Sequence, residues 1–263
     1  MADKNNPYNK PDASREPLEI KKTSDKVPAV IPALNISGIS DNYTKQEGSI
    51  SSALFVIVSG GEKKERQYFA KISDFNTFPR INIYFISKKG QGLTTKELVV
   101  KANEIKERLD ESNSADTPDS FYLISDRDHF YPEILSIKPE CIEKGFNLIV
   151  SNPCFEIWLY YSYYSEKPTD FEIPINVKEI SKKFKTYLEI KTKGGIDQRV
   201  AIFEIEKAIS NSEKNYDEDE NGIPTLFSTN MFLLCKGLLA LIQPELDSEK
   251  KREAIKKDQY KRK

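Results

Sequence analysis

Several residue types are scarce in this chain of 263 residues, and their scarcity removes several kinds of site. The sequence has three cysteines, one histidine and no Cys-x-x-Cys spacing, so it predicts neither a disulfide framework nor a structural zinc site. Apolar runs such as ALFVIV at 53–58 fall far short of the roughly 20 residues that cross a bilayer. The first ten residues, MADKNNPYNK, lack the apolar core of a signal peptide. We therefore expect a cytoplasmic protein with reduced thiols and no membrane contact.

An excess of charge of one sign is also missing. The chain has 40 Lys and Arg against 41 Asp and Glu, so its net charge does not indicate a nucleic-acid-binding protein. The charges are unevenly placed, with an acidic run at 217–220 and a basic tail at 246–263. The composition of the tail is typical of a solvated terminal helix. The alternative interpretation is a segment that contacts phosphates.

Composition divides the chain into three parts. Residues 1–50 are rich in Asn, Pro, Ser, Lys and Asp, a composition that buries too little apolar area to offset the entropy of ordering, and they predict a disordered arm. Residues 51–245 predict one folded domain, which becomes purely helical from about residue 166. The basic tail at 246–263 follows.

Strand-like and helix-like segments alternate through the first half of this domain. Alternation of this kind predicts a parallel sheet flanked by helices, an α/β fold. Thr94 and Glu97 have the spacing of a capping box at a helix start. Asn152 and Pro153 predict the N-cap and first turn of another helix. The four predicted strands are residues 52–60, 81–87, 120–125 and 146–151.

Two acids, Asp126 and Asp128, follow the third predicted strand. The carboxyl ends of parallel strands meet at one edge of a sheet, so the loops GGEKKE, DRDH and SNPCFE should lie together there. Side chains at i and i+2 can point the same way, and carboxylate oxygens suit Mg²⁺ or Mn²⁺. The pattern therefore indicates a metal site, although an Asp-x-Asp triplet is also common in charged surface turns.

The neighbours of these acids have more than one interpretation. Arg127 could offset the repulsion between two carboxylates or reach a phosphate oxygen, and His129 could carry a proton. A single histidine in a turn often has no such role. Glu156 lies near a predicted helix start, so it is either a partner of the helix dipole or a site residue. The run WLYYSYY at 158–164 favours a helix packed on the sheet over a base-stacking surface.

Three segments in this order, GGEKKERQYF, LISDRDHF and SNPCFEIWLYYS, resemble the RloB family, also called AbiLii-like, of prokaryotic defence proteins. The resemblance covers about residues 54–245, and SNPCFEIWL is its most specific part. The family is a branch of the Toprim superfamily, so the resemblance implies a parallel sheet flanked by helices, with additional C-terminal helices. It also implies Mg²⁺ or Mn²⁺ chemistry on phosphodiesters, an AAA- or ABC-type ATPase partner, and nucleic acid, including tRNA, as the substrate.

The resemblance assigns roles to individual positions. Asp126 and Asp128 match the Toprim Asp-x-Asp pair of metal ligands, and Glu65 matches the last glutamate of the family segment EGEKTE, as a third ligand. Glu156 and Asn152 match the acid and the asparagine of the family motif NPxFExW. The candidates for phosphate contact are Lys63, Lys64 and Arg127.

The chain departs from the family pattern at three positions. Gly60 stands where EGEKTE has its first glutamate, which serves Toprim enzymes as general acid and base or as metal ligand. Lys64 replaces the threonine of that segment, and Ser162 replaces a histidine after the tryptophan. Glu62 could substitute for the missing acid if the loop bends suitably. Otherwise Lys64 could occupy the vacated charge position, which would leave a scaffold without metal.

Three functions are compatible with these residues. The first is a Mg²⁺-dependent effector nuclease of a two-component anti-phage system of the abortive-infection type. The second is a catalytically degenerate Toprim module that binds and regulates an ATPase partner, and the third is a generic α/β binding domain. The sequence leaves open whether the chain is an enzyme and whether it forms a homo-oligomer. The catalytic candidates under the first function are Glu62, Glu65, Asp126, Asp128 and His129.

Overall fold

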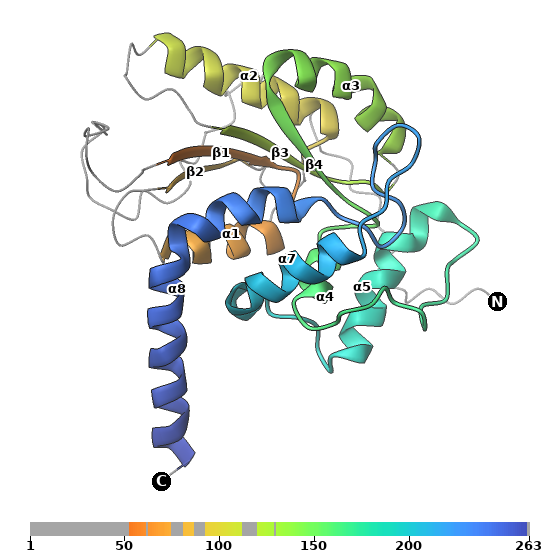
Figure 1. Ribbon diagram of the computed structural model, residues 1–263. Coiled ribbons are helices and arrows are strands. Elements are labelled where there is room, and N and C mark those ends of the chain that lie inside the picture. Colours follow the sequence, from red (N-terminus) through yellow and green to blue (C-terminus); the bar gives the residue numbers. More distant parts are fainter. Residues whose placement is uncertain are drawn as a thin grey trace, which may run out of the picture. The chain divides into compact units, whose positions relative to one another are not determined.

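The computed structural model describes residues 53–61, 63–74, 81–86, 93–111, 120–128 and 130–261, so the predicted arm at 1–50 lies outside the described part. The centre of the fold is a sheet of four parallel strands in the order β2-β1-β3-β4 (Figure 1). Each strand lies where the sequence predicts one, and helices flank the sheet. The expected α/β, Toprim-like architecture is therefore confirmed. The strands are β1 (Ala53–Ser59), β2 (Ile81–Ile86), β3 (Ser120–Asp126) and β4 (Phe146–Ser151).

Strand β1 lies inside the sheet and is apolar on both faces. Val56 and Val58 belong to the core on one face, and Phe55 and Ile57 belong to the core on the other. Because successive side chains of a strand point to opposite faces, a strand covered on both sides needs apolar residues at every position. This explains the unbroken run of apolar residues in β1.

Helices α2 (Thr95–Glu111) and α3 (Tyr131–Lys144) cover one face of the sheet (Figure 1). Leu98 and Ala102 of α2 recur at helical spacing and are fully buried in the core on that face. At the start of α2, the N–H of Thr94 donates to Oε2 of Glu97 (2.8 Å), and the N–H of Glu97 donates to Oγ1 of Thr94 (3.3 Å). The predicted capping box is therefore confirmed.

The other face carries the remaining helices, with the first part of α8 lying across the sheet (Figure 1). Tyr68 of α1 packs edge-on against Trp158 of α4, with 6.3 Å between ring centroids. Gly237 of α8 lies close to the ring of Phe55 in β1, where an added Cβ would sit 3.7 Å away. The elements are α1 (Lys64–Asp74), α4 (Glu156–Tyr161), η1 (Val177–Glu179), α5 (Ile180–Lys191), α6 (Gln198–Ala201), η2 (Ile202–Glu204), α7 (Ile205–Lys214) and α8 (Met231–Lys261).

The start of α4 differs from the prediction. The helix begins after Phe155, so Asn152 is not its N-cap. For the same reason Pro153 is not in its first turn. The side chain of Asn152 instead donates from Nδ2 to the carbonyl oxygen of Pro224 (2.9 Å). A buried hydrogen bond to a distant segment thus takes the place of the local cap that the sequence favours.

The first part of the aromatic run after β4 belongs to the core, as predicted, whereas Tyr163 near its end is exposed. Trp158, Tyr160 and Tyr161 are all buried. The hydroxyl of Tyr161 donates to the carbonyl oxygen of Phe227 (2.7 Å), which satisfies its polar end inside the protein. These side chains are therefore not available for base stacking.

Asn230 pairs with the outer edge of β4. Its Nδ2 donates to the carbonyl oxygen of Leu148 (3.0 Å), and its Oδ1 accepts from the N–H of Val150 (2.7 Å). Next to it, Thr229 forms an isolated antiparallel bridge with Ser151. The segment before α8 therefore continues the hydrogen bonding of the sheet beyond its last strand.

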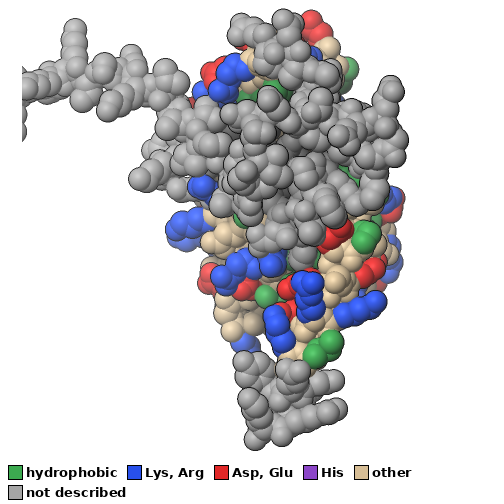
Figure 2. Space-filling model, turned by 90° about the vertical axis from the view of Figure 1, so that its left-hand side faces the viewer, with side chains coloured by type: hydrophobic (Ala, Val, Ile, Leu, Met, Phe, Trp, Pro, Cys, Tyr) green, Lys and Arg blue, Asp and Glu red, His purple; other side chains and the backbone are tan. Residues whose placement is uncertain are grey.

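Helix α8 continues through residue 246, where the sequence suggests that a basic tail begins. Figure 1 shows the helix bent, and Pro244 lies inside it, where a proline removes a backbone hydrogen bond and kinks the helix. Basic side chains of its second half pair with acids, as Arg252 does with Glu249 (3.2 Å). Figure 2 accordingly shows side chains of Lys and Arg interspersed with those of Asp and Glu on the face of the molecule that it draws. Within the described residues, no helix has both the length and the apolar character to cross a membrane.

Candidate functional site

The loops after β1, β3 and β4 are joined by hydrogen bonds at the carboxyl edge of the sheet. The N–H of Gly60 donates to the carbonyl oxygen of Ile124 (3.0 Å), and the N–H of Arg127 donates to that of Ser151 (2.8 Å). These bonds link the first loop to β3 and the third strand to the end of β4. The three segments that carry the sequence motifs therefore meet at one edge, where open α/β sheets bind ligands.

Asp126 is the last residue of β3, and its side chain reaches the start of α4. Its Oδ1 accepts the N–H of Phe155 (2.8 Å), so this carboxylate satisfies a backbone donor at the helix start that Asn152 does not cap. Burial raises the pKa of Asp126 well above its ordinary value, and the negative charges of Glu65 and Glu156 raise it further. Asp126 thus lies close to two other acids.

Glu65 lies in the first turn of α1 and is buried. Its carboxylate lies directly over Gly61, where an added Cβ would come within 1.9 Å of Cδ of Glu65. Only glycine at this position leaves room for the acid. The pKa of Glu65 is raised to about 7, mainly by burial and also by the negative charge of Glu156. A backbone hydrogen bond and the charges of Lys185 and Lys64 act in the opposite direction.

Glu156, the first residue of α4, is the third acid at this edge. Its side chain is 6% exposed, and two ammonium groups contact its Oε1, from Lys64 (3.2 Å) and from Lys185 (3.7 Å). We call Glu65, Asp126 and Glu156 the acid cluster, and Lys64 and Lys185 the lysine pair. The position of Glu156 fits both interpretations of the sequence, since it lies in the first turn of a helix and also within the acid cluster.

Lys185 comes from α5, outside the three motif segments, and the sequence did not single it out. Burial alone would lower the pKa of its ammonium group, but the negative charge of Glu156 and of the other acidic groups nearby raises it above its ordinary value. Lys185 therefore keeps its positive charge at neutral pH. Lys63, another candidate for phosphate contact, is exposed just before α1.

Asp128 lies in the turn after β3, with φ of 24°, a backbone conformation that non-glycine residues rarely adopt. Its N–H donates to the carbonyl oxygen of Pro153 (3.2 Å). This bond fixes the Asp-x-Asp turn against the loop that follows β4. Two other candidates, Glu62 and His129, lie outside the described residues.

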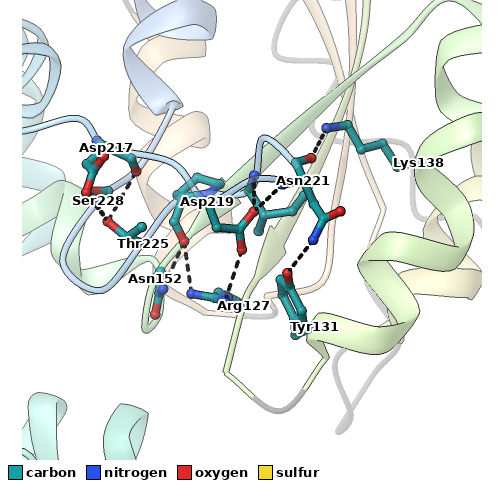
Figure 3. Close-up of polar contacts among 11 residues, drawn as sticks. Arg127, Tyr131, Lys138, Asn152, Asp217, Asp219, Asn221, Thr225 and Ser228 are labelled. Carbon is teal, nitrogen blue, oxygen red and sulfur yellow. Dashed lines mark hydrogen bonds and ion pairs between the residues drawn. The ribbon is translucent and has the colours of Figure 1, made fainter.

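Arg127 points toward the loop at 217–225 (Figure 3). Its guanidinium donates to Oδ2 of Asp219 and to the carbonyl oxygen of Pro224, both at 3.3 Å. It also lies over the ring of Tyr131, 4.4 Å from the centroid. Because Asn152 donates to the same carbonyl oxygen, the loop holds the turns after β3 and β4 together. We call Arg127, Asn152, Asp219 and Pro224 the polar clamp.

Further contacts hold the clamp loop in place, as Figure 3 shows. Oδ1 of Asp219 accepts from the N–H groups of Asn221 (3.0 Å) and Ile223 (3.1 Å). The side chain of Asn221 donates to the hydroxyl of Tyr131 in α3 (3.0 Å). The backbone carbonyl oxygen of Asn221 accepts from Lys138, also in α3. The loop is thus fastened both to α3 and, through Arg127, to the turn that follows Asp126.

The side chains of the acid cluster can be compared with the ligands that a divalent metal ion requires. The acid cluster offers buried carboxylate oxygens, which Mg²⁺ and Mn²⁺ prefer. No group of three or more His, Cys, Asp or Glu side chains is placed to hold a metal within the part of the chain that the structure describes, a part that does not include Glu62. The carboxylates of Glu65 and Asp126 are of the type that binds Mg²⁺ or Mn²⁺. A third metal ligand would have to move into place or come from outside the described residues.

Gly60, where the family segment has a glutamate, sits in a confined position. A Cβ added there would lie 3.1 Å from the carbonyl oxygen of Leu93, while the carbonyl oxygen of Gly60 accepts the N–H of Leu93 (3.2 Å). A side chain at this position would require the backbone around Leu93 to shift by a few tenths of an ångström. Glycine is the residue that fits the observed backbone.

Comparison with known proteins agrees with the resemblance carried by the three motifs. The family model described as RloB-like protein matches residues 55–238, a range that includes most of β1, all of β2 to β4, the acid cluster, the lysine pair and the polar clamp. No curated protein and no solved structure shows significant similarity to the chain. The family match covers more than half of the sequence, and on that basis the chain belongs to the RloB-like protein family.

Proposed function

We propose that this chain is an effector nuclease of a two-component anti-phage system, which cleaves phosphodiester bonds of nucleic acid. The observation that carries the proposal is the acid cluster. Three elements that are distant in sequence, α1, β3 and α4, bring Glu65, Asp126 and Glu156 together, at the edge where open α/β sheets bind ligands. The pKa values of Glu65 and Asp126 are raised by burial, and such acids are typical of sites that perform chemistry.

Each member of the site has a role suited to its surroundings. Glu65, whose pKa is about 7, can accept or donate a proton near neutral pH, as a general acid or base must. Asp126 holds the start of α4 in place through Phe155. Glu156 holds the ammonium groups of Lys64 and Lys185 at the edge of the site.

The family resemblance adds a metal ion, Mg²⁺ or Mn²⁺. Glu65, Asp126 and Asp128 are the residues that would hold it. When bound, such an ion lowers the pKa of a water molecule and stabilises the negative charge of the transition state. The remaining parts of the proposal, tRNA as one substrate and an AAA- or ABC-type ATPase as the partner that controls activity, rest on the resemblance.

A second function, a Toprim module without activity that regulates the ATPase partner, is favoured by a specific observation. Lys64 stands where the family has threonine, and its ammonium group contacts Glu156 at 3.2 Å. A lysine that neutralises an acid in this way can replace the charge of a metal. Gly60 also leaves the position of the first family glutamate without a carboxylate.

Calorimetric titration with Mn²⁺, combined with a cleavage assay, separates these functions. The parent chain, Asp126→Asn and the surface control Asp170→Asn would be titrated and then incubated with tRNA and with DNA in Mg²⁺. Asparagine keeps an oxygen that can accept the N–H of Phe155, so the variant should fold. The nuclease proposal expects binding and cleavage in the parent and the control, and loss of both in Asp126→Asn. Absence of both from all three folded proteins would favour the regulatory module.

A further inference from the structure

Lys185 and Lys64 are both held at the boundary between the acid cluster and solvent. Their ammonium groups contact the same oxygen, Oε1 of Glu156, although they come from different helices, α5 and α1. The Glu156 side chain is only 6% exposed, whereas those of Lys64 and Lys185 are 36% and 44% exposed. The lysines therefore form the outer layer of the site, and the acid forms the inner layer.

The two ammonium groups share one partner. Both contact the carboxylate of Glu156, and the charges of Asp126 and Glu65 also act on Lys185. A surface ion pair usually leaves both partners free to move, and it adds little stability. Here the buried carboxylate is held at the start of α4, so it fixes two lysine side chains side by side while their outer surfaces remain in contact with water. A pair of ammonium groups held in this way suits a phosphate anion.

We propose that Lys185, together with Lys64, forms a phosphate-binding pair at the mouth of the acid cluster, which makes Lys185 a further residue that contacts the substrate. Its assignment to nucleic acid rests on the proposed function, since a phosphodiester is the anion that the nuclease must bind. The phosphate binding itself rests only on the contacts with Glu156 and on the exposure of the two lysines. The two ideas can therefore fail separately.

The chain offers a matched control on the same helix. Lys183 of α5 pairs with Glu179 at 3.8 Å, and both of these side chains are more than half exposed. Lys183→Met removes an ordinary surface ion pair, while Lys185→Met removes one member of the lysine pair. Lys185→Arg keeps the positive charge and tests whether a positive charge at this position is sufficient for phosphate binding.

The first measurement uses inorganic phosphate as the probe. Lysine labelled with ¹³C at Cε gives one resonance for each ammonium-bearing carbon. The variants Lys64→Met, Lys183→Met and Lys185→Met each remove one resonance and so assign it. Phosphate should shift the Lys64 and Lys185 signals at a concentration where chloride of equal ionic strength does not, and the Lys183 signal should stay in place. Equal shifts of all three signals, or none, would overturn the proposal.

The second measurement uses the cleavage reaction. Lys185→Met should raise KM about tenfold with little change in kcat, because a substrate-binding contact is lost. Lys185→Arg should restore most of the affinity, and Lys183→Met should behave as the parent. If the parent cleaves nucleic acid and Lys185→Met matches Lys183→Met, the proposal is wrong and the nuclease function stands. If no protein cleaves, the nuclease function fails and the phosphate titration alone decides on the lysine pair.

Discussion

Replacing Glu65 by glutamine should make the stability of the protein less dependent on pH. Burial raises the pKa of Glu65 from 4.5 to about 7, so the folded protein binds this proton more tightly than the unfolded chain does. The contribution of Glu65 to stability is therefore greatest below about pH 4.5, and it is lost as the pH rises to about 7. Above that pH the folded protein must bury a charged carboxylate.

The size of the effect follows from the same pKa values. A tenfold change in proton affinity corresponds to about 1.4 kcal/mol, so a pKa raised from 4.5 to about 7 costs about 3 kcal/mol of stability at alkaline pH. Glutamine has nearly the shape of a protonated glutamate and carries no charge at any pH. We expect Glu65→Gln to match the parent at about pH 4.5 and to be more stable by about 2–3 kcal/mol at about pH 8.

Urea unfolding at a series of pH values measures this difference. The single tryptophan, Trp158, is fully buried, so its fluorescence reports loss of the core. Glu143→Gln, at an exposed glutamate of α3, is the matched control and should follow the parent at every pH. Some pH dependence should remain in Glu65→Gln, because burial also raises the pKa of Asp126. Curves for Glu65→Gln and the parent that stay parallel from acid to alkaline pH would refute the reasoning.

Three further substitutions test the fold around the site by urea unfolding. Arg127→Met removes the bonds from the polar clamp to Asp219 and Pro224 and should cost about 1–3 kcal/mol; a neutral result would mean that the clamp contributes nothing. Thr94→Ala removes one half of the capping box and should cost about 1 kcal/mol, whereas no loss would show that Glu97 alone is sufficient. Leu123→Ala empties a fully buried position in β3 and should cost about 2–5 kcal/mol, and a smaller cost would indicate that the core collapses around the gap.

The parts of the fold that depend on short-range pattern could be predicted from the sequence. The apolar run of β1 predicts a strand buried on both faces, and the spacing of Thr94 and Glu97 predicts a helix start, because both signals arise from neighbouring residues. The order of strands and helices then places the motif loops at one edge of the sheet. That order identified Asp126 and Glu156 as candidates, and Glu65 was identified by the resemblance to the RloB family.

The parts that depend on contacts between distant segments could not be predicted in this way. Asn152 has the local signature of an N-cap, but it donates to Pro224, 72 residues further along the chain. Lys185 lies in the segment SKKFK, where nothing in the sequence separates it from Lys182 and Lys183. Its role depends on the direction in which α5 presents that side chain to Glu156. Only tertiary structure supplies this information.

The side chain of Asn230 has a consequence for self-association. A strand at the edge of a sheet exposes backbone donors and acceptors that can pair with a second molecule, which is one route to fibrils and to sheets shared between subunits. Asn230 occupies that position on β4, since its amide both donates to Leu148 and accepts from Val150 as a neighbouring strand would. A second copy of the chain could extend the sheet through β4 only after displacing this asparagine and the segment before α8. The amide of Asn230 and the bridge from Thr229 to Ser151 thus protect the β4 edge against polymerisation.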